Sequence, residues 1–137
     1  MPLVVDASIA LAWALPDENS AYAEAALTVV EKEGLRVPEL WAREIANGLA
    51  VAYLRITSAD ERAFLAALSH LIIDIEETSD VLAVIRDGTA AALRYGLTAY
   101  DAAYVDLARR EGLTVATLDA AMRKAAEQSG IKIFRQE

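Results

Sequence analysis

Four acidic side chains stand at positions where a carboxylate could do chemistry: Asp6, Glu44, Asp101 and Asp119. Carboxylates within a few ångströms of one another repel, so they either raise each other's pKa or hold a cation. The chain has no cysteine and a single histidine. Such a cation would therefore be a hard ion with oxygen ligands, Mg²⁺ or Mn²⁺. A bound divalent ion can generate hydroxide from water and stabilise charge on a phosphoryl oxygen, so the chemistry indicated is phosphodiester hydrolysis.

Two of these acids directly follow short apolar runs that are typical of strands. Asp6 ends the run Leu3-Val4-Val5, and Asp119 lies just past the run 113–117. In an open parallel sheet, ligands bind at the carboxyl ends of the strands. We therefore expect Asp6 and Asp119 to point toward the same edge of a sheet.

The other two acids lie in predicted helices. Asp101 falls in the first turn of the helix that leads into the fourth predicted strand. Glu44 lies in the helix that follows Arg36-Val37-Pro38, on a stretch otherwise lined with apolar side chains. Its i±4 positions are Leu40 and Gly48, so it has no helical salt-bridge partner there. A carboxylate so close to an apolar stripe needs a reason to be there.

Three of the four acids also have a structural alternative. Asp6 could be the N-cap of the helix that follows it, and Asp119 could be the N-cap of a helix over Ala120 to Gln128. Asp101 fits the third position of a capping box opened by Thr98. No single acid decides between these alternatives, so the metal-site hypothesis depends on whether all four converge in space.

The segments that must position these acids alternate between short strands and alanine-rich helices. Apolar, β-branched runs predict about five strands, over residues 3–5, 36–37, 71–75, 113–117 and 131–134. A helix between successive strands implies right-handed βαβ crossovers. The sequence therefore predicts a parallel sheet that is covered by helices on both faces.

Local signals predict where several helices begin and end. Capping boxes are predicted at Ser58 with Glu61 and at Thr98 with Asp101. Left-handed glycine C-caps are predicted at Gly34, Gly96, Gly112 and Gly130.

Composition sets bounds on the molecule. The chain has 137 residues, with 13 Lys and Arg against 21 Asp and Glu, and so a net charge of −8. This is the length of one domain, and we expect residues 1–137 to form it. The longest charge-free stretch, Ala63 to Ile73, is too short to span a membrane, and the N-terminus has no signal-peptide pattern. We therefore expect a soluble cytoplasmic protein. Its acidic balance argues against simple electrostatic docking on nucleic acid.

In chain order, four segments resemble the motifs of PIN-domain ribonucleases, and most closely those of VapC-type toxins of type II toxin–antitoxin systems. The segments are 4–8, 38–47, 97–108 and 113–119, which carry Asp6 with Ser8, Glu44 with Asn47, Asp101, and Asp119. Because the four occur in the right order with a matching α/β context, the resemblance extends from residue 3 to about residue 134.

The resemblance implies an α/β fold, a three-layer α/β/α PIN-like domain with a short, mostly parallel central sheet. It also implies an endoribonuclease that depends on Mg²⁺ or Mn²⁺. Asp6 and Asp101 would be direct metal ligands, with Asp119 assisting a metal or a nearby water, and Glu44 would orient or deprotonate the attacking water. Ser8, Asn47 and Thr117 would support these groups by hydrogen bonds. Implied partners are an RNA substrate, a second copy of the chain in a homodimer, and a small antitoxin protein whose C-terminal segment blocks the nuclease groove.

Two other classes of protein are alternatives. A catalytically silent PIN-like module would keep the fold and only bind a partner, but retention of all four acids argues against it. An aspartate-based phosphotransfer or phosphatase domain would also place an Asp at a strand end. Here, however, the first strand continues Asp6-Ala7-Ser8 rather than Asp-x-Asp, and the only late-strand lysine, Lys132, lies within the last predicted strand.

Other prominent residues have simpler interpretations. Asp106 lies five positions after Asp101, about 500° around a helix, and is expected to face solvent. The single His70 is expected to be structural or exposed. Aromatic residues at helical spacing are interpreted as core or dimer contacts rather than as RNA-stacking groups: Trp13, Trp41, Tyr53, Tyr100 and Tyr104. Several basic residues are interpreted as solvated helix charges: Arg43, Arg109, Arg110, Arg123 and Lys124.

Overall fold

Short strands and longer helices alternate along the computed structural model, which describes residues 1–136. The first half contains β1 (Val4–Val5), α1 (Ala7–Ala14), the short 3₁₀ helix η1 (Pro16–Glu18), α2 (Ala21–Glu33), β2 (Leu35–Pro38) and α3 (Leu40–Val51). The second half contains α4 (Ser58–Ser69), β3 (Ile73–Glu76), α5 (Val81–Tyr95), α6 (Ala99–Glu111), β4 (Val115–Ala116) and α7 (Ala120–Gln128).

The strands pair in parallel. β1 pairs with β4, and β2 pairs with β3. A parallel bridge between Leu3 and Leu35 joins the two pairs, and a second bridge places Ile133 beside Val115. The order across the sheet is therefore β3, β2, β1, β4 and then the C-terminal segment. This order brings the ends of β1 and β4 side by side, as the positions of Asp6 and Asp119 require.

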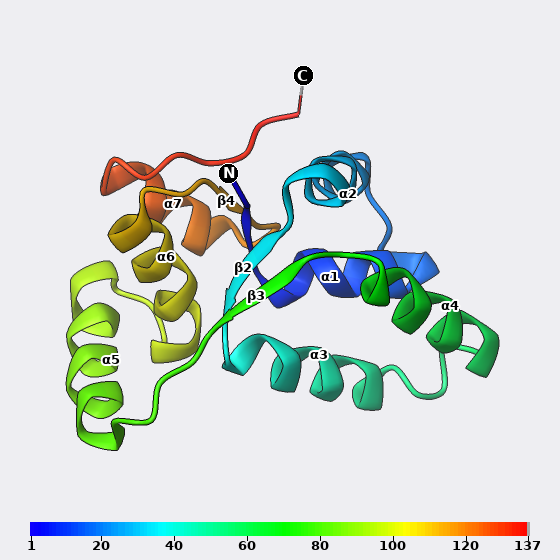
Figure 1. Ribbon diagram of the computed structural model, residues 1–137, viewed down its shortest axis with the longest axis horizontal. Coiled ribbons are helices and arrows are strands. Elements are labelled where there is room, and N and C mark those ends of the chain that lie inside the picture. Colours follow the sequence, from blue (N-terminus) through cyan, green and yellow to red (C-terminus); the bar gives the residue numbers. More distant parts are fainter. Residues whose placement is uncertain (137) are drawn as a thin grey trace.

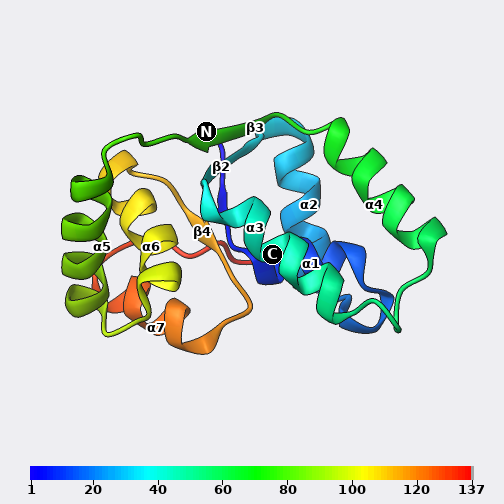
Figure 2. The same ribbon diagram turned by 90° about the horizontal axis from the view of Figure 1, so that it is seen from below.

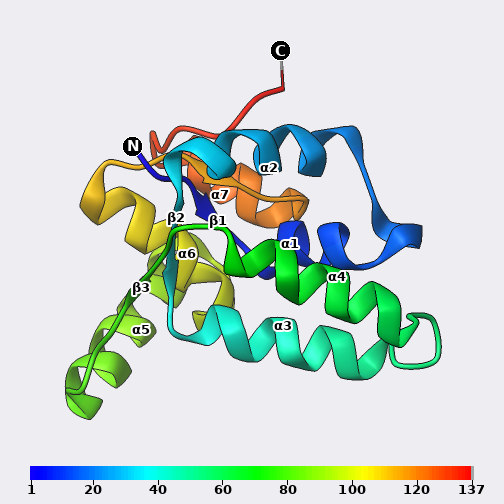
Figure 3. The ribbon, with the colours of Figure 1, turned by 45° about the vertical axis from the view of Figure 1, so that its right-hand side comes forward.

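Helices cover the sheet on both sides and make the three layers of the predicted α/β/α domain. Figure 1 shows α1 to α4 on one side of the strands and α5 to α7 on the other, and the view from below in Figure 2 shows the same division. α1 contacts α2, α3 and α4, while α6 contacts α5 and α7. Figure 3 shows α3 and α4 running beside α1.

Four of the five predicted strands form, with lengths that differ from prediction, and the fifth is reduced to a single bridge. The run 71–75 forms a strand only from Ile73 onward, and the run 113–117 only at Val115–Ala116. The run 131–134 makes an isolated bridge instead of a regular strand, with two backbone hydrogen bonds to Val115. A regular strand requires a partner over several residues, and β4 offers only two.

Helix boundaries follow the predicted chemistry with one shift of register. Thr98 is the N-cap of α6, and its Oγ1 accepts from the Asp101 N–H at 3.1 Å. The predicted capping box is only half formed, because within residues 1–136 the Thr98 N–H makes no return bond to the Asp101 carboxylate. The capping box of α4, however, consists of Thr57 and Asp60 and not of Ser58 and Glu61. Thr and Ser are both good caps, so the sequence left two registers open, and the extended backbone at Thr57 selects the first.

Gly34 differs from the left-handed cap that was predicted for it. Gly96 and Gly112 adopt that conformation, and Gly130 has a positive φ just after α7. Gly34 has φ 83° but ψ 179°, because the chain passes directly from α2 into β2. A Cβ there would also lie 3.0 Å from the Ile72 carbonyl oxygen, so this crossing of α2 over the sheet favours glycine.

The aromatic residues divide between core and surface. Trp41 and Tyr104 are buried in the core, and Trp13 packs against it. Tyr53 and Tyr100 are 76% and 66% exposed, so neither is a core residue, and of the two interpretations offered for them only a dimer contact stays a prediction. His70 is exposed at the end of α4, which confirms the expectation for it.

Contrary to the prediction, Asp106 does not face solvent. Its side chain is only 17% exposed and pairs with Arg109 at 3.0 Å and Arg110 at 2.9 Å. Arg110 also pairs with Glu76 of β3 at 2.8 Å. These two arginines are therefore ion-paired rather than merely solvated, because α6 lies close enough to the edge of β3 for Arg110 to bridge them.

Candidate active site

All four predicted acids line one pocket at the carboxyl ends of β1 and β4. The pocket has a volume of about 440 Å³ and lies between α1, α3, α6 and the start of α7. Its polar lining residues are Asp6, Ser8, Arg43, Glu44, Asn47, Tyr100, Asp101, Tyr104 and Asp119. Side chains separated by more than a hundred positions in the sequence therefore converge, which was the condition for the metal-site hypothesis.

Asp6 is both the N-cap of α1 and a wall of this pocket. Asp6 is only 4% exposed. Oδ1 accepts from the Ser8 hydroxyl at 2.6 Å and from the Ile9 N–H at 3.2 Å, and Oδ2 accepts from the Thr117 hydroxyl at 2.5 Å. These bonds fix the carboxylate rigidly.

Thr117 connects the two acids that follow strands. It is fully buried, and its Oγ1 accepts from the Asp119 N–H at 3.0 Å while donating to Asp6. Asp119 caps α7, with Oδ1 accepting from the Ala121 and Met122 N–H groups at 2.8 and 3.3 Å. The ends of β1 and β4 are thus joined by one chain of hydrogen bonds through Thr117.

Glu44 has a partner that the sequence interpretation missed. The Tyr104 hydroxyl of α6 donates to Glu44 Oε1, and Tyr104 is only 1% exposed. Tyr104 lies three positions after Asp101, so both fall on the same face of α6. That spacing is the signal that could have identified it, because a face that carries one pocket acid is the face most apt to carry another pocket group.

Burial and mutual repulsion set the electrostatics of the pocket. Burial raises the pKa of Asp6, and the nearby Asp101 raises it further, against the lowering effect of its hydrogen bonds. The pKa of Glu44 is raised by burial and, to a smaller extent, by Asp101 and Asp6. The pKa of Asp101 is raised by burial and then by Asp119. The acids therefore lie close enough to repel one another, and a cation would relieve that repulsion.

The donor set fits a hard divalent cation that keeps part of its water shell. Every acid in the pocket offers oxygen, and within residues 1–136 none of the four forms a salt bridge with a basic side chain. In the same part of the chain, no three acidic or imidazole groups are grouped tightly enough to enclose an ion. Mg²⁺ usually binds one or two carboxylates and retains several waters, so a wide pocket suits it.

The remaining predicted residues are placed as follows. Ser8 touches Asp6 directly, and its Oγ also accepts from the Leu118 N–H at 3.4 Å. Asn47 lines the pocket from α3 but is exposed, and in the described chain its side chain makes no hydrogen bond to the acids. Arg43 is the one basic residue among those that line the pocket.

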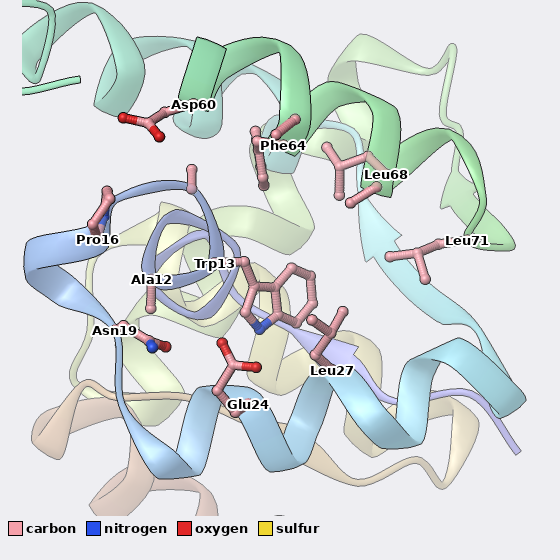
Figure 4. Close-up of a pocket in the computed structure, with 13 residues that line it drawn as sticks. Ala12, Trp13, Pro16, Asn19, Glu24, Leu27, Asp60, Phe64, Leu68 and Leu71 are labelled. Carbon is pink, nitrogen blue, oxygen red and sulfur yellow. The ribbon is translucent and has the colours of Figure 1, made fainter. Parts of the chain in front are cut away.

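A second, apolar groove lies away from the acids. It has a volume of about 260 Å³ between α1, α2 and α4 and shares no lining residue with the acidic pocket. Figure 4 shows Trp13 and Leu27 facing Phe64 and Leu68 across it. The Trp13 indole N–H is satisfied by the Ala23 carbonyl at 2.8 Å. The two carboxylates that line this groove, Glu24 and Asp60, come from opposite walls. Among the described residues, neither is grouped with other acids.

The fold and the pocket define a class: a three-layer α/β/α domain with a parallel sheet, whose strand ends and flanking helices present four carboxylates to one pocket. The PIN domain model matches residues 3–128, and the chain belongs to the PIN-domain family.

Individual relatives agree with this assignment. The chain is 36% identical to Ribonuclease VapC3 of Pyrobaculum aerophilum over 134 residues, which cover 93% of this chain and 95% of that protein. The crystal structure of PAE2754 from Pyrobaculum aerophilum matches with a TM-score of 0.63 and 27% identity, covering 94% and 93% of the two chains. The crystal structure of FitAcB from Neisseria gonorrhoeae shares the fold with a TM-score of 0.57 and 20% identity, covering 97% and 96%. Within residues 1–136, none of the helices is long and apolar enough to cross a membrane.

Proposed function

We propose that this protein is an endoribonuclease that uses Mg²⁺ or Mn²⁺ to hydrolyse RNA phosphodiester bonds. The observation that carries the proposal is the convergence of Asp6, Glu44, Asp101 and Asp119 in one pocket of a PIN fold. Further support comes from the relative named Ribonuclease VapC3, which matches over most of both chains. We also propose that residues 1–137 form a single domain that acts in the cytoplasm.

The four acids and the residues predicted to support them have proposed roles. Asp6 and Asp101 would hold the cation directly, and Asp119 would bind it or one of its waters. The cation would supply an acidified water and neutralise charge on the scissile phosphate. Glu44, held by Tyr104, would orient the attacking water and accept its proton at a carboxylate oxygen. Ser8 and Thr117 would keep Asp6 fixed, and Asn47 would contact RNA or water at the rim.

The acidic balance is compatible with an RNA substrate. Four of the 21 acids belong to the pocket, where a bound cation offsets their charge. A net charge of −8 nonetheless predicts weak non-specific binding, so the target would be selected by its shape. The same charge suits a basic segment of a partner protein. We therefore propose that the protein is the toxin of a toxin–antitoxin pair, and that its antitoxin covers this pocket.

RNA cleavage by purified Asp6→Asn and Asp101→Asn tests the proposal. The wild type is expected to cleave a defined RNA with Mg²⁺ or Mn²⁺ and to lose activity in EDTA. Each variant is expected to lose at least about 100-fold in rate, because removing a carboxylate that holds the ion removes the charge that stabilises the transition state. Asp80→Asn is the matched control, since Asp80 caps α5 outside the pocket. Equal cleavage by wild type and both variants would exclude these acids as ligands.

The alternative classes predict no RNA cleavage, and each has a further property that can be measured separately. A silent binding module would bind its partner and cleave no RNA with any metal. A phosphotransfer domain would form a stable aspartyl phosphate on Asp6. The pocket argues against the latter because no lysine is among the residues that line it.

A further inference from the structure

Arg123 reaches from α7 back to the end of β4. Its Nη2 donates to the Thr117 carbonyl oxygen at 2.9 Å. Its guanidinium lies over the ring of Tyr22, 5.1 Å from the ring centroid, in a cation–π contact. The sequence predicted only a solvated helix charge at this position, so this contact comes from the tertiary structure.

Tyr22 is in turn held by the C-terminal segment. The Tyr22 hydroxyl of α2 donates to the Phe134 carbonyl oxygen at 2.7 Å, and the two rings meet edge to face with centroids 5.5 Å apart. Figures 1 and 3 show this segment running back beside α2. Arg123 therefore rests on a platform built by two separate segments, α2 through Tyr22 and the C-terminal segment through Phe134.

Thr117 is the point where this platform meets the pocket. Arg123 holds its carbonyl oxygen, while its side-chain Oγ1 donates to Asp6 and accepts from the Asp119 N–H. A shift of the Thr117 backbone would move its hydroxyl, which donates to Asp6 and accepts from the Asp119 N–H. Both carboxylates would then shift in the pocket. Groups of this kind, which orient metal ligands without touching the metal, typically change metal affinity or activity by 10- to 100-fold.

We propose that Arg123, resting on Tyr22, positions the Thr117–Asp6 hydrogen bond and thereby sets the affinity of the acidic pocket for a divalent cation. This inference rests on the proposed function, because it assumes that the pocket binds such an ion. Arg123 Nε is buried without a hydrogen-bond partner in the described chain. An unpaired buried N–H is destabilising, so the contacts of Arg123 with the Thr117 carbonyl and the Tyr22 ring must offset this cost.

The sign of the effect distinguishes positioning from simple charge. Arg123→Met removes a positive charge near an anionic pocket, which by Coulomb's law alone would tighten cation binding. Loss of positioning would weaken it instead. Lys124→Met is the matched control, because it removes the same charge from the next residue of α7, whose side chain is exposed.

Mn²⁺ binding to the full-length protein, followed by the EPR signal of the free ion, tests this inference without depending on catalysis. We expect Arg123→Met to bind Mn²⁺ about 10-fold more weakly than the wild type, Arg123→Lys to lie between them, and Lys124→Met to match the wild type. Tyr22→Phe, which keeps the ring and loses the bond to Phe134, should shift affinity in the same direction by less. Circular dichroism verifies the fold of each variant, and Arg123→Lys and Tyr22→Phe decide the question if Arg123→Met unfolds.

A double-mutant cycle tests the route through Thr117. Thr117→Val removes the hydroxyl, so Arg123→Met should add little to it, whereas independent effects would multiply. Multiplied effects, or an affinity for Arg123→Met that is equal to or tighter than that of the wild type, would overturn the inference alone. A wild type that binds no Mn²⁺ would overturn both this inference and the proposed metal dependence.

Discussion

Two acids of the pocket serve the fold and the site at once. Asp6 and Asp119 each cap a helix through Oδ1, which satisfies N–H groups that would otherwise lack partners. The structural and functional interpretations of these residues are therefore compatible. Capping holds each carboxylate at the end of a strand, and this position places it in the lining of the pocket. The cost is electrostatic, because burial and the neighbouring acid raise the pKa of Asp6.

At the same scale, Tyr104 is expected to act through Glu44. Its hydrogen bond lowers the pKa of Glu44, against the raising effect of burial. Tyr104→Phe removes that bond, so the pKa of Glu44 should rise. If ionised Glu44 accepts a proton from water, the acid limb of the rate–pH profile should move to higher pH.

The size of this effect can be measured in steady-state kinetics. We expect kcat to fall about 10-fold with little change in KM, because Tyr104 touches Glu44 and need not touch RNA. Tyr53→Phe, at an exposed position away from the pocket, should leave both unchanged. An unshifted pH profile in Tyr104→Phe would mean that Glu44 does not titrate in the reaction.

At the scale of elements, local chemistry predicted which segments become helices and strands, and tertiary contacts set their limits. Thr98 and the apolar run before Asp6 carry their signals within a few residues. The length of β4 depends instead on what lies beside it, and the cap of α4 depended on a choice between two adjacent good caps. Asp6 and Asp119 could be predicted because they follow strands whose ends meet at one edge of the sheet, whereas Glu44 and Asp101, which lie on helices, were joined to them by the resemblance of their segments to PIN-domain motifs. The spacing from Asp101 could place Tyr104 on the pocket face of α6, but its bond to Glu44 and the contact of Arg123 with Thr117 could not be predicted, because these partners lie on other elements.

The close approach of α1 and α3 gives a prediction about two glycines. A Cβ at Gly48 would lie 2.4 Å from Leu11 Cδ1, whereas a Cβ at Gly88 of α5 would meet nothing within 4 Å. Alanine is preferred over glycine in a helix by up to about 1 kcal/mol, so Gly88→Ala should stabilise the protein by roughly that amount. Gly48→Ala should lose this gain to overpacking, which costs about 1–3 kcal/mol.

Chemical denaturation of both variants provides the measurement. The double variant Leu11→Ala with Gly48→Ala separates the clash with Leu11 from the helix preference of alanine. It removes the clash, so adding Gly48→Ala to Leu11→Ala should recover part of the stabilisation that alanine gives in a helix. Gly48→Ala alone proving as stabilising as Gly88→Ala would show that Leu11 moves aside freely. Because Gly48 also lines the pocket, the RNA cleavage rate of the Gly48→Ala variant should be measured in parallel.

The ion pairs of α6 predict how stability depends on pH. Hydrogen bonds from Arg110 and Arg109 outweigh burial and lower the pKa of Asp106 below its ordinary value of 3.8. A carboxylate whose pKa is lower in the folded state stabilises the fold above its unfolded pKa and loses that contribution as pH falls through the folded value. Asp106→Asn should therefore be less stable than the wild type at pH 7, by under about 1 kcal/mol since its partners are part-exposed.

Urea titrations at several pH values distinguish this contribution from a packing effect. The difference between the two proteins should shrink as the pH falls through the lowered folded-state pKa of Asp106, because the carboxyl is then protonated in both states of the wild type. Asp87→Asn, which breaks an ion pair between two well-exposed side chains, should change stability little at any pH. A difference at Asp106 that persisted unchanged in acid would assign its role to shape rather than charge.

At the scale of the whole molecule, α5 leaves an apolar surface uncovered. It contacts α6 through one face, where Ala91 and Tyr95 are buried, and exposes five large apolar side chains elsewhere: Val81, Leu82, Val84, Ile85 and Leu93. Several large apolar side chains exposed on one helix are typical of an interaction site. We propose a second copy of the chain as its occupant, as the family resemblance implies, which would leave the acidic pocket open because none of its lining residues comes from α5.

Sedimentation velocity across a range of protein concentrations tests this proposal. We expect a dimer for the wild type and a monomer for Leu82→Glu or Ile85→Glu, because each variant would bury an unpaired carboxylate at the interface. Leu54→Glu is the matched control: Leu54 is 93% exposed, but it lies in the turn after α3, so that variant should remain a dimer. Folded, monomeric α5 variants that still bind Mn²⁺ would show that the pocket is complete within one chain. A dimer that persists in both α5 variants would place the interface on another face.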